Sequence, residues 1–389
     1  MILQALVLII LIILLINAVY LLVFSVAGAI SESKIPKVSH DPGEQTYLIL
    51  IPAYKEDAVI LKSVEHAMAI DYPASKFHCA VIADGFKDET IVAIKSMGAE
   101  AFVMPDDENR NKSKSIQKYL AHCYEEYDNV LVLDGDNCVE RDILHRANVY
   151  FHTGAKVLQA RRVAKNETNS MSRLDSLSET INNHIFRKGQ RALGFSASLI
   201  GSGMFMKLSI FRMVMEDMDV FSGFDKELEL RILKNRLTIN YASDILVYDE
   251  KVTSHEVFVN QRRRWTYAQY FFLKKNALNS LHELILKGNI DYFNKVLQFA
   301  LLPRVLCIVL SVIMIPVAAF TGESFLFMSL LVFADVFIAI LLSVRNELKW
   351  NEILTLTSRI PAVFFGMVKA IVTSQQASKK FIHTPHNAN

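Results

Sequence analysis

The first 30 residues carry no charged side chain, and this constrains the fold more than any other feature of the 389-residue chain. A helix needs about 20 apolar residues to cross the hydrocarbon core of a bilayer, so this run can span it with some tilt. The run is longer than the apolar core of a cleaved signal peptide, and no basic segment precedes it. We therefore predict that residues 1–30 form an N-terminal transmembrane anchor.

A second apolar region lies toward the other end of the sequence. Residues 301–320 and 325–344 are further candidates to span the membrane, and the short turn between them predicts a hairpin. Residues 353–373 are apolar but contain two basic residues and a proline, which fits a short span or an interfacial helix. The length of this segment favours a span, whereas Lys379 and Lys380 in the tail favour the cytoplasmic side.

Basic residues after the first apolar run set the predicted orientation. Because Lys34 and Lys37 follow that run, the positive-inside rule places the next domain in the cytoplasm, at the inner or plasma membrane. Arg304 lies near a helix end, where its side chain can extend toward the interface. Asp335 falls within a span, which fits a polar path through the membrane or a neutral or paired structural carboxylate.

The remainder of the chain has the composition of a soluble domain, which explains the overall content of 52% hydrophobic and 21% charged residues. The predicted division is an anchor at 1–30, a cytoplasmic domain at 31–270, an interfacial helical linker at 271–296, membrane or interfacial helices at 297–373 and a tail at 374–389. A net charge of +2 gives no argument for a nucleic-acid partner. The four cysteines show no Cys-x-x-Cys spacing, which fits inert thiols in a reducing compartment.

Short apolar runs alternate with segments of helical periodicity in the cytoplasmic domain. The predicted strands are at residues 46–53, 77–83, 100–104 and 129–133, and the predicted helices at 56–69, 88–97 and 111–127. This order predicts an α/β fold with a mostly parallel sheet and flanking helices, which would bind ligands at the carboxyl ends of its strands. No Gly-x-Gly-x-x-Gly and no P-loop motif follows a strand, so neither type of nucleotide site is supported.

Asp134 and Asp136 follow the fourth predicted strand and are separated by one glycine. Two carboxylates at a strand end can hold Mg²⁺ or Mn²⁺, which would bridge a diphosphate and neutralise the charge of a leaving group. A solvated turn is the alternative explanation for an isolated Asp-x-Asp. The four apolar residues directly before the motif favour the metal site.

Two more clusters are compatible with a binding site. Residues 261–265 read Gln-Arg-Arg-Arg-Trp, which fits a phosphate clamp with an indole stacked on a sugar, or a basic turn at an anionic lipid surface. Residues 225–229 bring carboxylates into the first turn of a helix, where such groups commonly stabilise the helix dipole. One of these carboxylates could instead be a general base toward an acceptor hydroxyl.

In their order along the chain, these motifs resemble glycosyltransferase family 2. They resemble in particular its membrane-integrated, often processive members related to cellulose, chitin and hyaluronan synthases. The resemblance covers residues 46–270 and implies a GT-A-like fold. Its six motifs are Ile-Pro-Ala-Tyr-Lys-Glu at 51–56, Ala-Asp-Gly at 83–85, Asp-Gly-Asp at 134–136, Gly-Ser-Gly at 201–203, Glu227, and Gln-Arg-Arg-Arg-Trp at 261–265.

The resemblance implies that residues from four of these motifs, together with one lysine between them, bind the sugar donor. The implied donor residues are Tyr54, Glu56 and Asp84 for the base and ribose, Lys112 and Asp134 for the nucleotide, Asp136 for the metal, and Arg262 and Arg264 for the diphosphate.

The resemblance also implies an acceptor site. Gly201, Ser202 and Gly203 would border it, because small residues allow a sugar to approach closely. Gln261 and Trp265 would bind the terminal sugar of the acceptor.

Glu227 aligns best with the catalytic base of the family, and with Asp136 it completes the implied catalytic pair. Lys226 precedes it where the family commonly has an acidic residue, so Asp225 and Glu229 also remain possible bases.

The predicted reaction is inverting, metal-dependent glycosyl transfer from a nucleotide-diphosphate sugar, with uridine the favoured nucleoside, which extends a polysaccharide at the membrane. One alternative is the addition of a single sugar to a lipid acceptor. A less favoured alternative is a sugar-binding or transport membrane protein without catalysis. The predicted partners are the donor, a glycan or lipid-linked acceptor and the bilayer, while the sugar, the linkage and the oligomeric state stay open.

Overall fold

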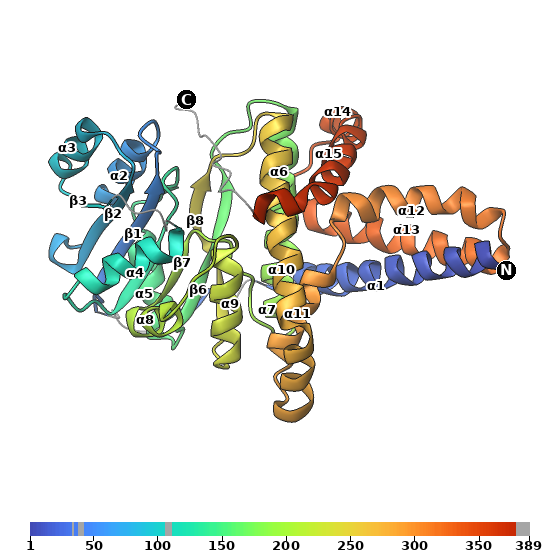
Figure 1. The fold of residues 1–389 in the computed structure, drawn as a ribbon, viewed down its shortest axis with the longest axis horizontal. Helices are drawn as coiled ribbons and strands as arrows, with labels where there is room; N and C mark the ends of the chain where they lie inside the picture. Colours follow the sequence, from blue (N-terminus) through green and yellow to red (C-terminus); the bar gives the residue numbers. More distant parts are fainter. Residues whose placement is uncertain (33–34, 38–42, 106–110, 379–389) are drawn as a thin grey trace.

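A mixed sheet and a projecting helical stalk make up the computed structural model (Figure 1), which describes residues 1–32, 35–37, 43–105 and 111–378. Within those residues, eight strands form one sheet in the order β3-β2-β1-β4-β7-β6-β8-β5. Their bounds are β1 Tyr47–Tyr54, β2 Phe77–Asp84, β3 Glu100–Val103, β4 Asn129–Val132, β5 Cys138–Val139, β6 Val157–Ala164, β7 Met204–Lys207 and β8 Ile239–Asp249. Lys34, Lys379 and Lys380, which entered the predicted orientation, lie outside the described residues.

The predicted parallel pairing is confirmed for the first half of the sheet. Strand β1 pairs in parallel with β2 and β4, and β2 pairs in parallel with β3. Strand β7 runs antiparallel to both β4 and β6, and β5 runs antiparallel to β8, so the sheet as a whole is mixed. The reversal at β7 arises because the chain leaves β6 at its carboxyl end, passes through helices and re-enters the sheet from that same end.

Helices cover both faces of the sheet because its central strands are apolar on both faces. The helices of the soluble part are α2 Ile60–Met68, α3 Asp88–Ser96, α4 Lys112–His122, α5 Ile143–His152, α8 Leu208–Met215 and α9 Phe224–Lys234. On one face, Leu48 and Leu50 pack with residues of α4, α8 and α9. On the other face, Ile49 and Ile51 pack with residues of α2, α3 and α5.

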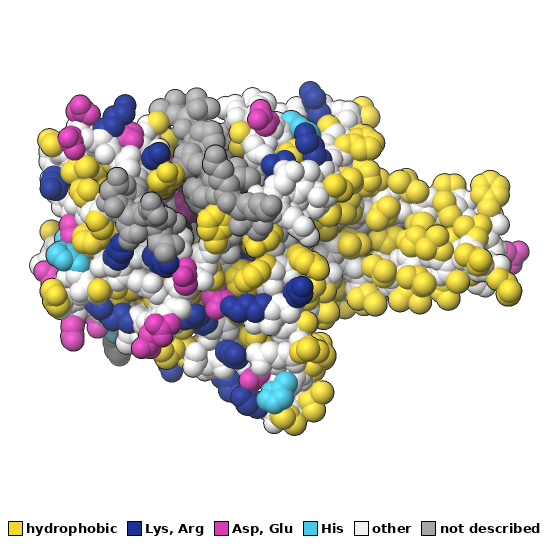
Figure 2. Space-filling view, in the orientation of Figure 1, with side chains coloured by type: hydrophobic (Ala, Val, Ile, Leu, Met, Phe, Trp, Pro, Cys, Tyr) yellow, Lys and Arg dark blue, Asp and Glu magenta, His cyan; other side chains and the backbone are white. Residues whose placement is uncertain are grey.

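Three helices form the stalk: α1 Ile2–Ile30, α12 Arg304–Ala319 and α13 Glu323–Val344. Leu11 of α1, Met314 of α12 and Val336 of α13 meet in its buried core. Figure 2 shows apolar side chains over the visible face of the stalk and charged ones over the rest of the molecule. By length and apolar composition, α1 and α13 can each cross a membrane, and two bent helix pairs raise the number of candidate spans to as many as four in the described chain.

The first bent pair joins α11 Ile290–Ala300 to α12 at 61°, and the second joins Trp350–Thr357 to α15 Ile360–Val372 at 47°. The second pair contains α14 Ile353–Thr357 and covers the segment whose length favoured a span. Helix α15 packs against the long helix α10 His255–Lys287 at the base of the stalk (Figure 1). Helix α10 also runs unbroken through residue 270, where the sequence predicted the linker to begin.

One irregular helix joins the soluble part to the stalk. After α6 Ser170–Asn182, the chain forms a π-helical turn, η2 Asn183–Gly189, and a short α7 Gln190–Ala192. His184 Nε2 in this turn donates a hydrogen bond of 2.8 Å to the carbonyl oxygen of Ser25 in α1. Gly189 lies so close to α1 that a Cβ atom there would meet the carbonyl oxygen of Phe24.

Candidate active site

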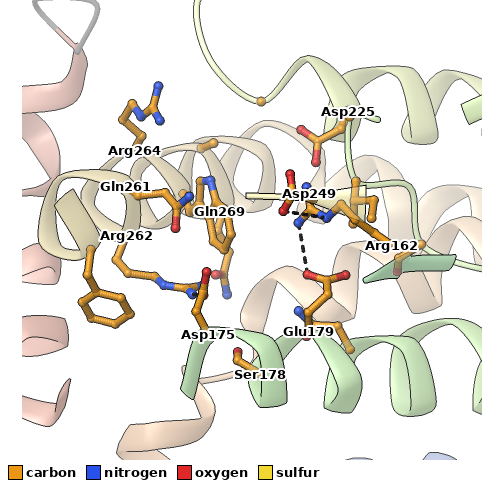
Figure 3. Close-up of a pocket in the computed structure, with 18 of the residues that line it drawn as sticks. Arg162, Asp175, Ser178, Glu179, Asp225, Asp249, Gln261, Arg262, Arg264 and Gln269 are labelled. Atoms are coloured by element: carbon orange, nitrogen blue, oxygen red, sulfur yellow. Dashed lines mark hydrogen bonds and ion pairs between the residues drawn. The ribbon is translucent and has the colours of Figure 1, made fainter. Parts of the chain in front are cut away.

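A cavity of about 1090 Å³ lies between the carboxyl ends of the strands, helices α6 and α10, and the base of the stalk. Figure 3 shows part of its lining, with labelled residues contributed by β6, β8, α6, the first turn of α9 and α10. The sequence predicted the binding site at these strand ends, and the structure adds the helices at the base of the stalk as a further wall.

The first predicted donor residues meet at the ends of β1 and β2. Tyr54 and Asp84 pair directly in the parallel register, and both line the cavity together with Glu56. Gly135 approaches them from the end of β4 so closely that a Cβ atom there would lie 2.0 Å from the Glu56 Oε2 atom. The Asp-Gly-Asp motif therefore requires its central glycine on steric grounds.

Lys112 connects two of the predicted motifs. Its Nζ atom donates to Asp134 Oδ1 at 2.6 Å and to the carbonyl oxygen of Gly201 at 3.1 Å. The side chain of Asn111 accepts a hydrogen bond from the backbone of Lys114 and so caps the helix that begins at Lys112. This cap fixes the helix end from which Lys112 reaches into the site.

Asp136 is 3% exposed and faces the cavity. Its carboxylate accepts hydrogen bonds from Asn137 Nδ2 at 3.0 Å and from the backbone N–H of Glu250 at 3.3 Å, one on each oxygen. A carboxylate oxygen can accept more than one partner, and hard oxygen donors are what Mg²⁺ and Mn²⁺ prefer. In the described chain no three His, Cys, Asp or Glu residues group as metal ligands. The donor set therefore fits a divalent ion that takes its remaining ligands from a diphosphate.

The three candidate bases on α9 have different surroundings. Asp225 lines the cavity (Figure 3). Glu227 pairs with Arg231 Nε at 3.1 Å and with Lys275 Nζ at 3.2 Å, and it is not part of the cavity lining in the described chain.

Glu229 is 1% exposed and lies 2.8 Å from Lys295 Nζ. Burial raises the pKa of Glu229 to about 7 even though Lys295 opposes this shift. Glu229 is therefore a buried partner of Lys295, and the geometry favours Asp225 over the predicted Glu227.

Gln261, Arg262, Arg264 and Trp265 all line the cavity from α10, as predicted. The Arg262 guanidinium lies 2.7 Å from Asp175 Oδ1 and 4.2 Å from the centre of the Trp265 ring. Arg262 is thereby held against α6, which does not favour the predicted contact with the diphosphate (Figure 3). Arg264 points away from Arg262, and burial lowers its pKa.

Gly201 lines the cavity, but Ser202 and Gly203 lie behind it in the described structure. The Ser202 hydroxyl donates to Asn137 Oδ1 and accepts from the backbone N–H of Asp134 at 3.2 Å. Ser202 therefore positions the Asp-Gly-Asp loop, and only Gly201 of the predicted three borders the cavity.

A buried charge network that extends from the carboxyl ends of β6 and β8 to α6 and η2 was missed by the sequence analysis. Glu179 lies 3.0 Å from Arg162 Nη2 and 2.9 Å from Arg187 Nη1. Asp249 lies 3.5 Å from Arg162 Nε and 2.8 Å from Lys251 Nζ. Burial opposes ionisation of Glu179, but Arg162 and Arg187 outweigh burial and hold its pKa below the usual range. Adjacent arginines at the end of the otherwise apolar β6 were the signal in the sequence.

Comparisons with known proteins agree with this arrangement. The family described as "Glycosyltransferase like family 2" matches residues 42–268. The "Beta-monoglucosyldiacylglycerol synthase" of Synechocystis sp. is 23% identical over 283 residues, which cover 64% of this chain and 56% of that protein. The "Probable glycosyltransferase YdaM" of Bacillus subtilis is 23% identical over 263 residues, which cover 63% of this chain and 60% of that protein. The chain thus spans less than two thirds of the length of either relative.

A solved structure shares the whole fold. It is a mannosyltransferase, PcManGT from Pyrobaculum calidifontis, determined in complex with GDP-Man and Mn²⁺. The likeness covers 97% of this chain and 100% of that one, with a TM-score of 0.56 and 14% sequence identity. It shows the GT-A-like fold that the sequence predicted.

Proposed function

The chain belongs to glycosyltransferase family 2, and from this premise we propose that it transfers one sugar from a nucleotide-diphosphate sugar to a lipid acceptor at the membrane. Addition of a single sugar to a lipid was the alternative in the sequence analysis. We favour it here over extension of a polysaccharide.

One observation carries the choice of acceptor: a single cavity is lined by polar groups at one end and by membrane helices at the other. Asp134 and Asp136 line it at the strand ends. Ile308 of α12, Ile340 of α13 and Met367 of α15 line it near the stalk. An amphiphile fits such a cavity, because its head can reach the strand ends while its chains stay against apolar side chains.

We assign the donor to the strand ends. Tyr54 and Asp84 would bind the nucleoside, while Lys112 holds Asp134 in place by its 2.6 Å ion pair. Asp136 would hold the divalent ion together with the donor diphosphate. When bound, that ion supplies positive charge that stabilises the departing diphosphate.

Asp225 is the proposed general base. Its carboxylate would take the proton from the acceptor hydroxyl as the hydroxyl oxygen attacks the anomeric carbon from the face opposite the diphosphate. The new bond joins the acceptor oxygen to that carbon, and the bond to the diphosphate breaks with its electron pair leaving on the nucleoside diphosphate. The configuration at the anomeric carbon is inverted, because the acceptor oxygen attacks from the face opposite the leaving group.

Extension of a polysaccharide is the second candidate, because Gln261 and Trp265 line the cavity as the resemblance to processive synthases implies. The predicted polar path through Asp335 receives no support from the cavity, since Asp335 is not part of its described lining.

We also propose that the protein is multi-pass with its catalytic domain in the cytoplasm. The C-terminal end of α1, the N-terminal end of α12 and the C-terminal end of α13 all lie at the soluble part, while the N-terminus lies at the far end of the stalk (Figure 1). Lys37, Arg345 and Lys349 therefore lie at the end of the stalk that the positive-inside rule assigns to the cytoplasm.

The test is to incubate the purified full-length chain with uridine- and guanosine-diphosphate sugars, Mn²⁺ and a membrane lipid extract. Mass spectrometry of the lipid and aqueous fractions then identifies the product. A lipid heavier by one sugar supports the proposal, and a sugar polymer in the aqueous fraction supports the second candidate. Absence of both products in the presence of every donor would contradict the proposed activity.

A further inference from the structure

We propose that the lipid acceptor is anionic, and that its phosphate group binds between Arg304 and Arg262 at the membrane end of the cavity. This inference rests on the proposed function, because it specifies the class of lipid that the cavity accepts. It concerns a group of side chains that we call the basal cluster.

The basal cluster contains the charged side chains that interact with one another where the cavity meets the stalk. Its carboxylates are Asp175, Glu179 and Asp249, and its cations are Arg162, Arg187, Lys251, Arg262 and Arg304. All eight line the cavity. Within this set the cations outnumber the carboxylates by two, and Asp134 at the strand ends also acts on Arg162. At least one positive charge is therefore uncompensated in a poorly solvated place, where this is costly.

Arg304 accounts for part of this excess. Its Nη1 atom donates to Asn182 Oδ1 at 2.6 Å, and its Nη2 atom donates to the hydroxyl and carbonyl oxygens of Ser178 at 2.9 and 3.1 Å. These acceptors are neutral, and within the described residues no carboxylate lies in ion-pair distance of Arg304. The side chain is thus turned into the cavity, which corrects the expectation that it extends toward the membrane interface.

Arg262 supplies a second donor. Its Nη2 atom pairs with Asp175, but its buried Nε–H has no hydrogen-bond acceptor in the described chain. The whole residue is 9% exposed and repels Arg304 electrostatically. A phosphate between these two guanidinium groups would relieve the repulsion and satisfy the unpartnered donor.

The apolar surroundings point to a lipid phosphate. Ile308 lies one helical turn beyond Arg304 on α12, and Val344 and Leu356 line the cavity on the stalk side. A phosphate at the basal cluster would leave its acyl or prenyl chains against these side chains. The donor diphosphate has its own place at the strand ends, where Asp136 would hold the divalent ion that binds it.

The decisive variant is Asn182→Asp. It replaces a neutral acceptor 2.6 Å from Arg304 with a carboxylate of the same shape, so the hydrogen bond is kept while the excess charge falls. The matched control is Arg345→Gln, which removes a cation near the same end of the stalk but outside the cavity lining. Arg304→Lys is a second variant, since it keeps the charge and loses the forked geometry.

The measurement is native mass spectrometry of the full-length protein in detergent. It records the binding of dioleoyl phosphatidic acid, of dioleoylglycerol and of inorganic phosphate. We expect the wild type to bind the phosphatidic acid about tenfold or more tightly than the dioleoylglycerol, as a charge-assisted bidentate contact allows. We expect Asn182→Asp to abolish most of this preference, Arg304→Lys to weaken it and Arg345→Gln to keep it.

Three results would overturn the inference: equal binding of both lipids by the wild type, an unchanged preference in Asn182→Asp, or binding of inorganic phosphate as tight as that of phosphatidic acid. The last result would assign the cluster to a free anion.

Sugar transfer is measured separately on each lipid. If phosphatidic acid binds with the expected preference but no lipid gains a sugar with any donor, the anion site stands and the proposed function fails. If dioleoylglycerol accepts sugar as well as anionic lipids do, the proposed function stands and the inference fails.

Discussion

Asp225 and Glu227 lie two residues apart in the first turn of α9, and of the two only Asp225 faces the cavity. Two residues correspond to about 200° around a helix, so neighbouring acidic positions in one motif point to nearly opposite sides. Glu227 is turned toward Arg231 and Lys275, which hold it as a buried, ion-paired carboxylate.

We expect Asp225→Asn to lower kcat by about 10²- to 10⁴-fold, which is the usual contribution of a general base. Its affinity for the donor should stay within a factor of about three, because the substitution removes a base and leaves the strand ends unchanged. Steady-state kinetics and binding of the nucleoside diphosphate by calorimetry measure the two quantities.

Glu227→Gln is the matched control. It removes the charge of a buried carboxylate that pairs with Arg231 and Lys275, so we expect a loss of about 1–3 kcal/mol in stability and a kcat close to that of the wild type. A variant Glu227→Gln without activity, beside an active Asp225→Asn, would restore the assignment that the sequence favoured.

The alignment of motifs could place the base only within a segment of five residues, because three carboxylates at 225–229 compete for the role. Separating them requires knowing which side of α9 faces the cavity, and that depends on how α9 packs against the sheet and α10.

The strand-end residues were easier to predict, since Tyr54, Asp84 and Asp134 each end or follow a short apolar run. The antiparallel β7 could not be predicted, because strand direction depends on the path of the intervening helices.

The basal cluster was invisible in the sequence for a different reason. Arg162, Glu179 and Asp249 come from separate elements that only tertiary packing brings together. Arg262 belonged to a recognisable motif, but its position in that motif did not reveal that Asp175 would hold it against α6.

Removal of the divalent ion should weaken binding of the nucleoside diphosphate by about tenfold or more, because the protein offers few carboxylates and the phosphates complete the ligand set. In Asp136→Asn we expect the affinity to change little between Mn²⁺ and chelator. Calorimetric titrations of the nucleoside diphosphate with Mn²⁺ and with a chelator measure this dependence.

Asp134→Asn is the control for the metal experiment. Asp134 pairs with Lys112, so its loss should lower the affinity by a similar factor in Mn²⁺ and in chelator. An Asp136→Asn variant that keeps the full metal dependence would move the metal site away from Asp136.

The buried carboxyl of Glu229 predicts a pH dependence of stability. Burial raises the pKa of Glu229 from 4.5 to about 7, above its value in the unfolded chain, although Lys295 opposes the shift. The folded state therefore binds more protons than the unfolded state between about pH 4.5 and 7, so this carboxyl makes the protein more stable as the pH falls through that window.

We expect the stability difference between the wild type and Glu229→Gln to shift in favour of the wild type by about 3 kcal/mol from pH 8 to pH 5. Thermal unfolding in detergent at a series of pH values gives the difference, because titration of all other groups is common to both proteins. A difference that does not vary with pH would show that Glu229 is ionised throughout.

The close approach of Gly189 to α1 predicts that α1 supports the cavity wall through η2, whose Arg187 lines the cavity, and is not only a tether. A Cβ atom at Gly189 would lie 2.0 Å from the carbonyl oxygen of Phe24, so Gly189→Ala must push η2 and α1 apart at a cost of about 1–3 kcal/mol. Arg187 in the same turn pairs with Glu179 at the cavity, so transfer to the acceptor should also fall.

Gly154→Ala separates this collision from the general effect of losing a glycine. Gly154 has φ +92°, and no atom of the described residues lies within 4 Å of the place that an added Cβ would take, so only backbone strain of about 1 kcal/mol is expected there. Thermal unfolding in detergent and kcat/KM for the lipid acceptor are measured for both variants. We expect Gly189→Ala to lose more stability and to lower kcat/KM, and Gly154→Ala to leave kcat/KM unchanged. Equal behaviour of the two variants would mean that α1 can move from η2 without disturbing the cavity.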